Sequence, residues 1–352
     1  MPKALKPFAQ RLVDWQRQHG RHDLPWQQSR DPYRVWLSEI MLQQTQVSTV
    51  MGYYQRFLDR FPAVSDLAAA SLDEVLGLWS GLGYYSRARN LHACAQRVEA
   101  EFQGAFPTNM ADLQSLPGIG PSTAAAIASL CFEAREAIMD GNVKRVLSRF
   151  HGFDLDLSIS VHDKQLKQLA VADLPDASHD MPAYTQGLMD LGATLCTQRK
   201  PDCPRCPMRE DCVALSEGRP EHYPVKTRKI KRSAQSIWLL CAVTEAGEVW
   251  LQQRPVQGVW GSLFTQPLFD SEEALRAALP ARLNTSLQFD DAFVHVLTHK
   301  DLHLHPVRLK LALAEKLGEG AWYNAQQWPS MGLPAPVRQL LAKQAVQRSS
   351  SR

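Results

Sequence analysis

The chain has 352 residues, which is long for a single hydrophobic core, so two domains are expected. Its composition, 45% hydrophobic and 21% charged residues, is typical of a water-soluble globular protein, and it has no apolar run of about 18 residues that would predict a membrane span. The net charge of +3 gives only weak support for a polyanionic partner. Residues 1–6 lack the apolar core of a signal peptide, so we expect an intracellular, cytoplasmic protein.

Helical patterns fill the first part of the chain. Phe8, Leu12 and Trp15 predict a helix over 8–19, and Asp31 followed by Pro32 is typical of a helix start, with Asp as the cap. Further helical patterns follow at about 44–60, 72–79, 84–103, 122–131, 142–150, 160–171 and 179–192. Pro or Gly separates most of them. Residues 1–224 are therefore expected to form an all-α domain with short connections.

The pattern changes after a basic segment, 225–235, which we interpret as a linker. Strand-like runs occur at 237–244, 249–253, 292–298 and 302–313, and helical patterns at 275–279 and 337–346. Residues 236–346 are thus predicted to form a separate α+β domain. Residues 347–352 are predicted to be a disordered tail.

A Gly-x-Gly turn at 118–120 leads into an Ala-rich helical run, and a lone carboxylate, Asp140, precedes the next helical pattern. Backbone amides at such a turn, at the N-terminus of a helix, can hold a phosphate. Taken alone, Asp140 is interpreted as an ordinary helix cap. Together the two features point to a protein that grips a nucleic-acid backbone and does chemistry beside it.

Four of the seven cysteines lie close together, with the spacing C-x6-C-x2-C-x5-C: Cys196, Cys203, Cys206 and Cys212. In a reducing compartment such a group is expected to bind metal rather than to form disulfides. Four thiolates can hold a zinc ion or an iron–sulfur cluster. The single C-x2-C pair and the uneven outer spacings favour the cluster.

Several motifs occur together in order. LPGIGPS at 116–122, the aspartate about twenty residues later and the cysteine pattern resemble the helix-hairpin-helix DNA glycosylases of the endonuclease III superfamily. SEIMLQQTQV at 38–47, GLGYYSRARNL at 81–91 and DGNVKRVLSRF at 140–150 look like the MutY-type adenine DNA glycosylases. The resemblance covers residues 8–213. It implies an all-α helix-hairpin-helix fold, a 4Fe–4S cluster on the cysteine loop at 196–212, and excision of adenine.

Two carboxylates are the catalytic candidates. Base excision needs an acid for the leaving adenine and a group that stabilises the cationic sugar. Periodicity alone would make Glu39 an exposed helix residue, but Glu39 matches the family's catalytic acid and Asp140 the superfamily's catalytic aspartate. The apolar neighbours of Glu39 predict a raised pKa, whereas amide donors and the helix dipole are expected to keep Asp140 ionised.

Ser122 departs from the lyase-type members of the superfamily, in which this position is a lysine that forms a Schiff base with the sugar. A serine cannot form one, so a monofunctional glycosylase is implied. Lys144 is a nearby amine and is interpreted as a phosphate contact on a helix surface.

The resemblance also implies DNA contacts. Gln43 and Gln44 match residues near the flipped-out position, with Gln44 placed to wedge into the duplex, and Tyr84 matches an aromatic that stacks beside the base opposite the adenine. Gly118, Gly120 and Ser122 belong to the phosphate-binding hairpin. Asn142 is expected to position Asp140 or a water.

The second domain resembles a NUDIX domain, through the run R-P-x-x-G-x-W-G at 254–261, but lacks the acidic NUDIX box. It is therefore expected to bind rather than to hydrolyse, and in the family it recognises 8-oxoguanine opposite the adenine. The family's Phe-Ser-His loop appears here as Leu297, Thr298 and His299, so Leu replaces the aromatic residue.

The expected partner is double-stranded DNA with adenine opposite 8-oxoguanine or guanine, bound by a monomer that associates with the nucleoid. Two alternatives remain. One is an endonuclease III-like glycosylase/lyase that acts on damaged pyrimidines, which Ser122 and the extra domain argue against. The other is a non-catalytic iron–sulfur DNA-binding or redox-sensing protein, which the presence of both Glu39 and Asp140 argues against.

Overall fold

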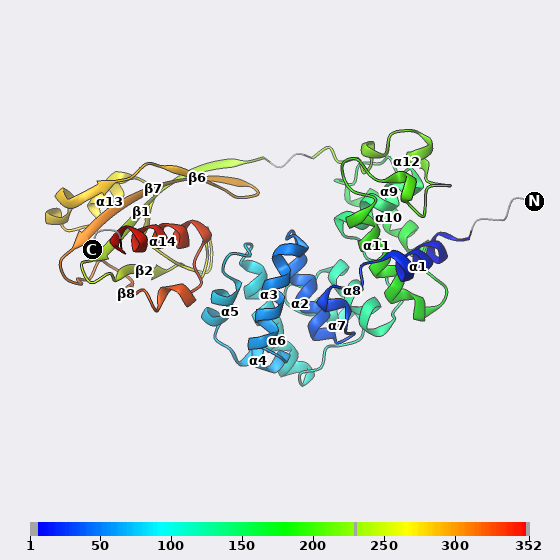
Figure 1. Cartoon of the computed structure of the whole chain (residues 1–352), viewed down its shortest axis with the longest axis horizontal. Coiled ribbons are helices and arrows are strands. Elements are labelled where there is room, and N and C mark those ends of the chain that lie inside the picture. Colours follow the sequence, from blue (N-terminus) through cyan, green and yellow to red (C-terminus); the bar gives the residue numbers. More distant parts are fainter. Residues whose placement is uncertain (1–5, 229–230, 350–352) are drawn as a thin grey trace, which may run out of the picture. The chain divides into compact units, whose positions relative to one another are not determined.

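The structure is a computed structural model that describes residues 6–228 and 231–349. These residues form two compact units (Figure 1), one from residues up to 68 and 93–228, the other from 69–92 and the chain after 229. The first unit is all-α and the second is built on a β-sheet, so the predicted fold class is confirmed. No helix of the described residues is long and apolar enough to cross a membrane.

The segment 69–92 belongs to the second unit, although its sequence motif places it in the helical domain. It carries α5 (Leu72–Trp79) and the start of α6 (Ser86–Phe102). Its polar contacts reach the C-terminal part of the chain: Ser80 Oγ donates to the Leu333 carbonyl at 2.9 Å, and Gln253 Nε2 donates to Asp73 Oδ1 at 2.9 Å. The chain passes from the first unit to the second again after Arg228, inside the predicted basic linker.

The first unit consists of short helices. They are α1 (Phe8–His19), η1 (Pro25–Gln27), α2 (Pro32–Leu42), α3 (Val47–Arg60), α4 (Val64–Ala69), α7 (Met110–Ser115), α8 (Pro121–Phe132), α9 (Gly141–His151), α10 (Ser160–Ala172), η2 (Ser178–Asp180), α11 (Met181–Thr194), η3 (Cys203–Arg205), α12 (Val213–Ser216) and η4 (Pro220–His222). The helix start expected at Asp31 is confirmed, since its side chain accepts a hydrogen bond from the Tyr33 amide.

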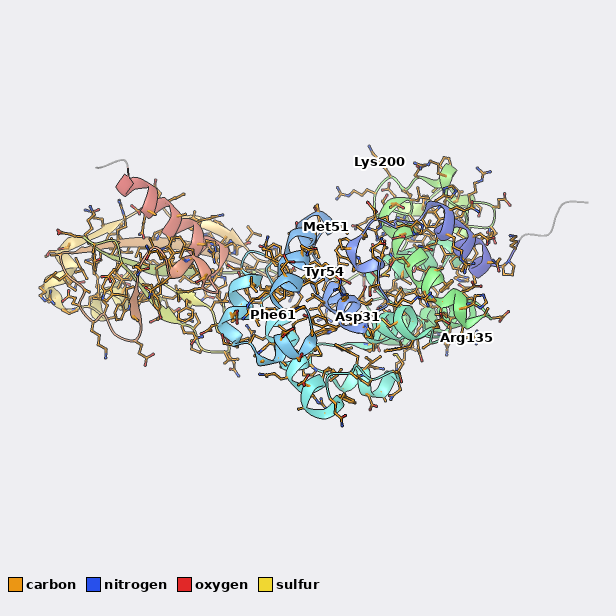
Figure 2. All side chains as sticks on the ribbon, turned by 60° about the horizontal axis from the view of Figure 1, so that its bottom comes forward. Asp31, Met51, Tyr54, Phe61, Arg135 and Lys200 are labelled. Atoms are coloured by element: carbon orange, nitrogen blue, oxygen red, sulfur yellow. The ribbon has the colours of Figure 1, made fainter. Side chains whose placement is uncertain are left out.

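Polar bonds from tyrosines fix α2 against α3. Tyr33 Oη donates to the Phe61 carbonyl at 2.7 Å, and Tyr54 Oη donates to the Arg34 carbonyl at 3.3 Å. Figure 2 labels Tyr54, Phe61 and the capping residue Asp31, which lie in this part of the unit. Tyr54 and Phe61 are buried, so the Tyr54 hydroxyl and the Phe61 carbonyl would each cost free energy if they were buried without a hydrogen bond. They hold α2 in a defined position.

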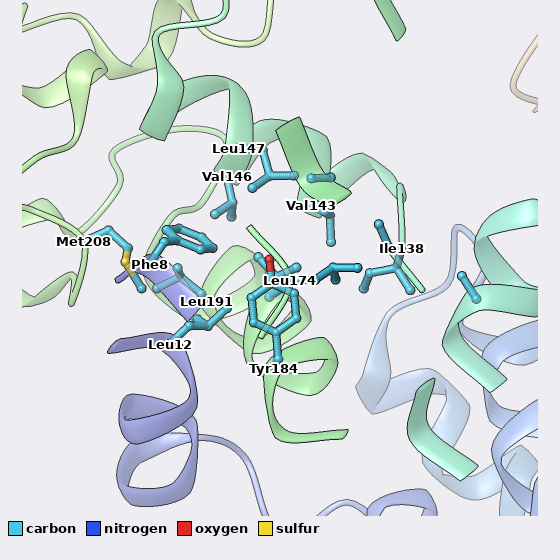
Figure 3. Close-up of a cluster of buried hydrophobic side chains, with 14 of the residues drawn as sticks. Phe8, Leu12, Ile138, Val143, Val146, Leu147, Leu174, Tyr184, Leu191 and Met208 are labelled. Carbon is cyan, nitrogen blue, oxygen red and sulfur yellow. The ribbon is translucent and has the colours of Figure 1, made fainter. Parts of the chain in front are cut away.

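A hydrophobic core in the first unit packs α1, α9 and α11 together (Figure 3). Leu12 of α1, Val143 and Leu147 of α9, and Tyr184 and Leu191 of α11 are all buried within it. The apolar residues of α9 recur at helical spacing, so one side of that helix faces this core. The start of α9, where Asp140 lies, is thereby anchored by packing.

Gly192 of α11 marks a close approach to α9. A Cβ at this position would lie 2.8 Å from the Cβ of Asn142, a distance that real side chains do not tolerate. We expect Gly192→Ala to lower the free energy of unfolding by about 1–3 kcal/mol, because overpacking outweighs the gain in helix propensity. Chemical denaturation with two spectroscopic probes measures the change.

Gly141→Ala is the matched control for this substitution. Gly141 is the first residue of α9, and nothing lies within 4 Å of a Cβ placed there. This variant is expected to be as stable as the wild type or slightly more stable. Equal stability of the Gly192→Ala and Gly141→Ala variants would contradict the close contact between α9 and α11.

The second unit is organised on one mixed sheet. It contains β1 (Ser233–Thr244), β2 (Val249–Gln253), β3 (Phe264–Thr265), β4 (Leu268–Phe269), β5 (Leu287–Phe289), β6 (Phe293–Val296), β7 (Lys300–Leu311) and β8 (Ala321–Tyr323). The strand order is β3-β2-β1-β7-β5, with β4 on β1, β6 on β7 and β8 on β2. The long strands β1 and β7 pair in parallel from Ser233↔Lys300 to Thr244↔Leu311, and the other pairs are antiparallel.

Each face of this sheet carries its own core, because side chains alternate along a strand. Leu239 and Cys241 face α14 (Ala335–Ser349), whose Val337 and Leu341 are buried there. Leu240 faces the other way, toward α13 (Glu272–Ala277) and η5 (Ala281–Ser286). Figure 1 shows α13 and α14 beside the sheet.

Some predicted boundaries differ from the structure. The helix expected at 44–60 begins at Val47, because residues 43–46 form a turn after α2. The short helices α4 and α7 and the strands β3, β4, β5 and β8 were not predicted, since each is too short to show a period. Residues 347–349, expected to begin a disordered tail, continue α14, and 350–352 lie outside the described residues.

Candidate active site

Glu39 lies on α2 and lines a cavity of about 280 Å³ in the first unit. Its neighbours Leu37, Ile40 and Met41 are buried, so α2 is packed on most of its surface around this carboxyl group. The cavity walls combine apolar and polar side chains, among them Leu24, Trp26, Gln27, Val35, Ser38, Leu42, Val47, Leu130, Gln186 and Met189.

The carboxyl group of Glu39 has a strongly shifted acidity. Burial raises the pKa of Glu39 to about 7, and the negative charge of Asp140 adds to the shift. A substantial fraction of Glu39 is therefore protonated at neutral pH, as a proton donor requires. The raised pKa expected from the apolar sequence context agrees with this.

Asp140 caps α9. Its Oδ1 accepts a hydrogen bond from the Val143 amide at 2.7 Å, and its backbone is extended, as at an ordinary N-cap. Burial nevertheless raises the pKa of Asp140, while the amides of Val143 and Asn142 and the charge of Arg145 oppose the shift. The amides thus favour the ionised form, as expected from the sequence, but burial outweighs them in the direction of the shift.

Asn142 is tied to the cysteine loop rather than left free. Its Oδ1 accepts a hydrogen bond from Arg145 Nη2 at 2.9 Å. Arg145 also donates to the carbonyls of Gly192 and Cys196, both at 2.8 Å. Arg145 thus holds Asn142, two residues after Asp140, and also binds Gly192 near the end of α11.

The predicted hairpin is formed by α7 and α8, joined by the turn at 116–120. Gly118 has φ +76°, a left-handed conformation that glycine adopts without strain, and it is exposed. Gly120 is the N-cap of α8 and has no side chain that could accept hydrogen bonds from the first amides of the helix. Ser122 faces the chain before Asp140, because its Oγ accepts a hydrogen bond from the Met139 amide at 3.1 Å.

The other predicted contact residues of the first unit lie in two places. Gln43 ends α2, and Gln44 follows it, exposed and with φ +56°, in a tight turn. Lys144 lies on α9 with its Nζ 2.5 Å from Asp163 Oδ1 of α10, and its side chain is only 21% exposed. Lys144 is therefore already paired with a carboxylate.

The four clustered cysteines line one small cavity, of about 20 Å³, together with Arg149 and Pro201. None of the four forms a disulfide within the described residues. Within the described part of the chain, no three His, Cys, Asp or Glu side chains are grouped to hold a single metal ion. Burial raises the pKa of the Cys206 thiol to about 12.

Arg149 of α9 braces the cysteine loop. It is 2% exposed, and its guanidinium donates to the carbonyls of Thr197, Gln198 and Pro220. Its Nη1 also lies 3.3 Å from Cys196 Sγ. A buried cation beside the thiols fits a group that carries negative charge when metal is bound. The donor set of four cysteines with one arginine is thus compatible with a thiolate-ligated cluster.

The second unit has a cavity of its own, of about 690 Å³. Tyr84, 42% exposed and with φ +48°, lines it together with Thr298 and His299 from the β6–β7 turn. Tyr84 Oη and Thr298 Oγ1 are 2.5 Å apart and share a hydrogen bond. Two predicted contacts from segments more than 200 residues apart in sequence are therefore brought together.

Three residues that shape these sites were not predicted. Arg145 and Arg149 follow Asn142 at helical spacing, a signal that could have placed them on one side of α9. Gln27 lines the Glu39 cavity, and both polar atoms of its amide are buried without a hydrogen-bond partner among the described residues. No pattern in the sequence distinguishes Gln27 from a surface glutamine.

Both parts of the chain match families of known proteins. The HhH-GPD superfamily base excision DNA repair protein family matches residues 37–171, and the NUDIX domain family matches residues 238–343. A solved thermostable thymine-DNA glycosylase is 29% identical, with a TM-score of 0.54 over 60% of this chain and 95% of that one. An endonuclease III–DNA complex, 20% identical with a TM-score of 0.50, shares the fold over 60% of this chain and 94% of that one. These matches define a helix-hairpin-helix base excision repair protein.

Curated relatives narrow the class, and some of them match nearly the whole chain. Adenine DNA glycosylase from Buchnera aphidicola subsp. Acyrthosiphon pisum is 38% identical over 95% of this chain and 96% of its own length. Adenine DNA glycosylase from Homo sapiens is 44% identical over 59% of this chain and 39% of its own. The chain belongs to the adenine DNA glycosylase family.

Proposed function

We propose that this chain is a monofunctional glycosylase of base excision repair, which removes adenine from double-stranded DNA when it stands opposite 8-oxoguanine or guanine. One observation carries the proposal. Glu39 lines a cavity in the first unit, and burial together with the negative charge of Asp140 raises its pKa to about 7. Cleavage of an N-glycosidic bond needs an acid and a second carboxylate, and here the acid lines a cavity while the second carboxylate is near enough to raise its pKa.

The reaction assigns a role to each carboxyl group. The target adenine leaves the duplex stack and enters the cavity, where protonated Glu39 gives its proton to the base. The bond between the sugar C1′ and the base nitrogen breaks, and its electron pair leaves with adenine. Ionised Asp140 stabilises the cationic sugar. Water then adds to C1′ and releases a proton, which balances the one that Glu39 gave.

The reaction stops at the abasic site. Ser122 carries a hydroxyl group that accepts a hydrogen bond from Met139 and cannot form a Schiff base with the sugar. Lys144, an amine four residues after Asp140, forms an ion pair with Asp163. Neither side chain supports strand cleavage, which favours a hydrolase over the alternative of a pyrimidine-specific glycosylase/lyase.

DNA binding is assigned to three features of the first unit. The exposed turn at Gly118 and the start of α8 present backbone amides to a phosphate, with Ser122 beside them. Gln44, exposed in its left-handed turn beside Gln43, suits a wedge in the duplex because an amide replaces lost base-edge hydrogen bonds. Asn142, fixed by Arg145, helps to set the position of Asp140.

Recognition of 8-oxoguanine is assigned to the cavity of the second unit. Tyr84 offers an exposed ring, and Thr298 and His299 offer polar groups at the same cavity. The hydrogen bond between Tyr84 and Thr298 supports a joint role of the two segments. A stacked base with its edge toward polar side chains is the usual way to read an unpaired base.

We assign a 4Fe–4S cluster to Cys196, Cys203, Cys206 and Cys212, because all four line one cavity with the buried Arg149. When bound, the cluster cross-links a loop that has little apolar core of its own. Arg145 and Arg149 join this loop to α9, whose first turn holds Asp140. The protein is further proposed to act as an intracellular monomer.

Arg149→Leu is expected to empty the cysteine loop of iron. The substitution removes the donor to the carbonyls of Thr197 and Gln198 in the loop, to the Pro220 carbonyl after it and to the Cys196 sulfur, which leaves buried acceptors unpaired. We expect iron and sulfide per chain to fall to roughly half or less, together with a lower melting temperature. Iron content and the visible absorbance of the purified protein measure the loss.

Arg205→Leu is the matched control, because Arg205 lies in the same loop with its side chain 77% exposed. Its iron content is expected to equal that of the wild type. If Arg149→Leu kept a full complement of iron and sulfide, Arg149 would not brace the cluster loop.

The proposed reaction is tested by identifying its products. A duplex with radiolabelled adenine opposite 8-oxoguanine is incubated with the protein, and the released material is separated by chromatography. Free adenine with an intact strand is the expected result. Release of a nucleotide, or a broken strand before any alkaline treatment, would contradict it.

A further inference from the structure

The turn at 255–262 in the second unit holds Trp260 in an unusual conformation. Trp260 has φ +59° and Ser262 has φ +64°, and Gly258 between β2 and β3 has φ +93°. A positive φ is an outlier for a bulky residue such as tryptophan. Strained residues of this kind persist only where the surroundings enforce them, and they concentrate at binding sites.

The surroundings of the turn do enforce this conformation. Arg89 Nη1 from the start of α6 donates to the Gly261 carbonyl at 2.8 Å, and the Ser262 amide donates to the Pro255 carbonyl at 3.1 Å. Gly261 has no room for a side chain, since a Cβ there would lie 2.1 Å from the Val256 carbonyl oxygen. Tight backbone contacts thus hold the turn on both sides of Trp260.

The indole lines the same cavity as Tyr84 and Thr298. Trp260 is only partly buried, so it keeps a surface toward the cavity while its remainder packs on the core under the sheet. Its ring lies 6.2 Å from the ring of His295, which also lines the cavity and whose pKa burial lowers. A residue that only filled the core would not need a strained backbone.

We propose that Trp260 is a second aromatic surface of this cavity and stacks on the base opposite the adenine, together with Tyr84. The inference rests on the proposed lesion recognition and adds a specificity-determining residue to it. An aromatic face stabilises any base, and the polar groups of Thr298 and His295 then distinguish among base edges. Trp260 lies in the NUDIX-like run at 254–261, to which the proposed reaction assigns no other role.

The test compares affinities for duplexes that differ only opposite the adenine. The adenosine carries a 2′-fluoro group to prevent cleavage, and the opposite position holds 8-oxoguanine, guanine or an abasic analogue. The quantity of interest is the ratio of the Kd for the abasic duplex to the Kd for the 8-oxoguanine duplex. In the full chain, Trp260→Leu is expected to lower this ratio about tenfold, and Trp260→Phe by about threefold or less.

Val256→Ala is the matched control, since Val256 belongs to the same turn, is 69% exposed and does not line the cavity. It is expected to leave the ratio unchanged. An unchanged ratio in Trp260→Leu would overturn the inference while the lesion recognition stood. A wild-type ratio near one would instead remove the lesion recognition itself, and the inference with it.

A second measurement covers the case in which Trp260→Leu does not fold. 2-Aminopurine replaces the opposite base, and its emission in the complex is compared between the wild type and Trp260→Phe. Stacking on an indole quenches this fluorophore, so the wild-type complex is expected to be the darker one. Equal emission from the two complexes would overturn the stack.

Discussion

Glu39→Gln is expected to slow adenine release at least about a thousandfold, because the amide cannot give up a proton to the leaving base. The side chain keeps its size and removes a buried ionisable group, so the fold is expected to be as stable as before. Affinity for the substrate duplex is expected to stay within about threefold, since phosphate contacts supply most of it. Single-turnover kinetics and a binding titration on the same duplex separate the two effects.

The acidity of Glu39 adds a pH dependence to this prediction. The active form is protonated, and its pKa is raised to about 7 by burial and by the Asp140 charge. The wild-type rate is therefore expected to fall about tenfold per pH unit above pH 7. Protonation of Asp140, whose pKa is also raised, removes activity on the acid side.

Glu101→Gln is the control for this substitution, because Glu101 is an exposed carboxylate that pairs with Arg97 on α6. It is expected to keep the wild-type rate and pH profile. Retained turnover in Glu39→Gln, or an alkaline limb that the substitution leaves unchanged, would remove Glu39 from the role of the acid.

Asp140→Asn is expected to reduce adenine release by a similar factor, at least about a thousandfold, for a different reason. Asparagine can still cap α9, so the Val143 amide keeps an acceptor and the helix start is preserved. What is lost is the negative charge that stabilises the cationic sugar. Single-turnover rates on the duplex with 8-oxoguanine opposite the adenine measure the loss.

The charge of Asp140 also acts on Glu39, which supplies a second readout. Since Asp140 raises the pKa of Glu39, Asp140→Asn is expected to move the alkaline limb of the residual activity to lower pH. Asp163→Asn, which removes the carboxylate paired with Lys144, is the control and is expected to leave that limb in place. An unshifted limb in Asp140→Asn would show that the two carboxyl groups do not interact.

The sequence predicted the helix starts that depend on local signals and the elements that are long enough to show a clear hydrophobic pattern. Asp31 and Pro32 mark the start of α2 because capping and a fixed proline φ are local effects. The long strands β1 and β7 are visible as apolar runs, and the change of pattern after 232 marks the second unit. Their parallel pairing could not be predicted, because it depends on residues about 70 positions apart.

The catalytic candidates were predictable in part. Periodicity alone would have left Glu39 exposed; the family resemblance made it the acid, and its apolar neighbours on α2 then predicted the raised pKa that burial produces. The direction of the Asp140 shift was not predictable, because capping is local whereas burial depends on how α9 packs against α11. The family resemblance supplied what local patterns lacked, since it paired two carboxylates a hundred residues apart in sequence.

Contacts between distant segments could be found only in the structure. The motif around Tyr84 matched the helical domain, yet the segment packs in the second unit, where Tyr84 meets Thr298. Arg149 looked like any helix arginine until its bonds to the cysteine loop were visible. A side chain of this kind has no sequence signature, because its role depends on a buried environment built by other segments.

Cleavage of three duplexes, analysed with and without alkali, tests the central claim most directly. Their target bases are adenine opposite 8-oxoguanine, adenine opposite guanine, and thymine glycol. The account predicts strand breaks only after alkali and only in the two adenine-containing strands, because Glu39 and Asp140 remove the base and Ser122 leaves the strand intact. Direct nicking at thymine glycol without alkali would contradict it.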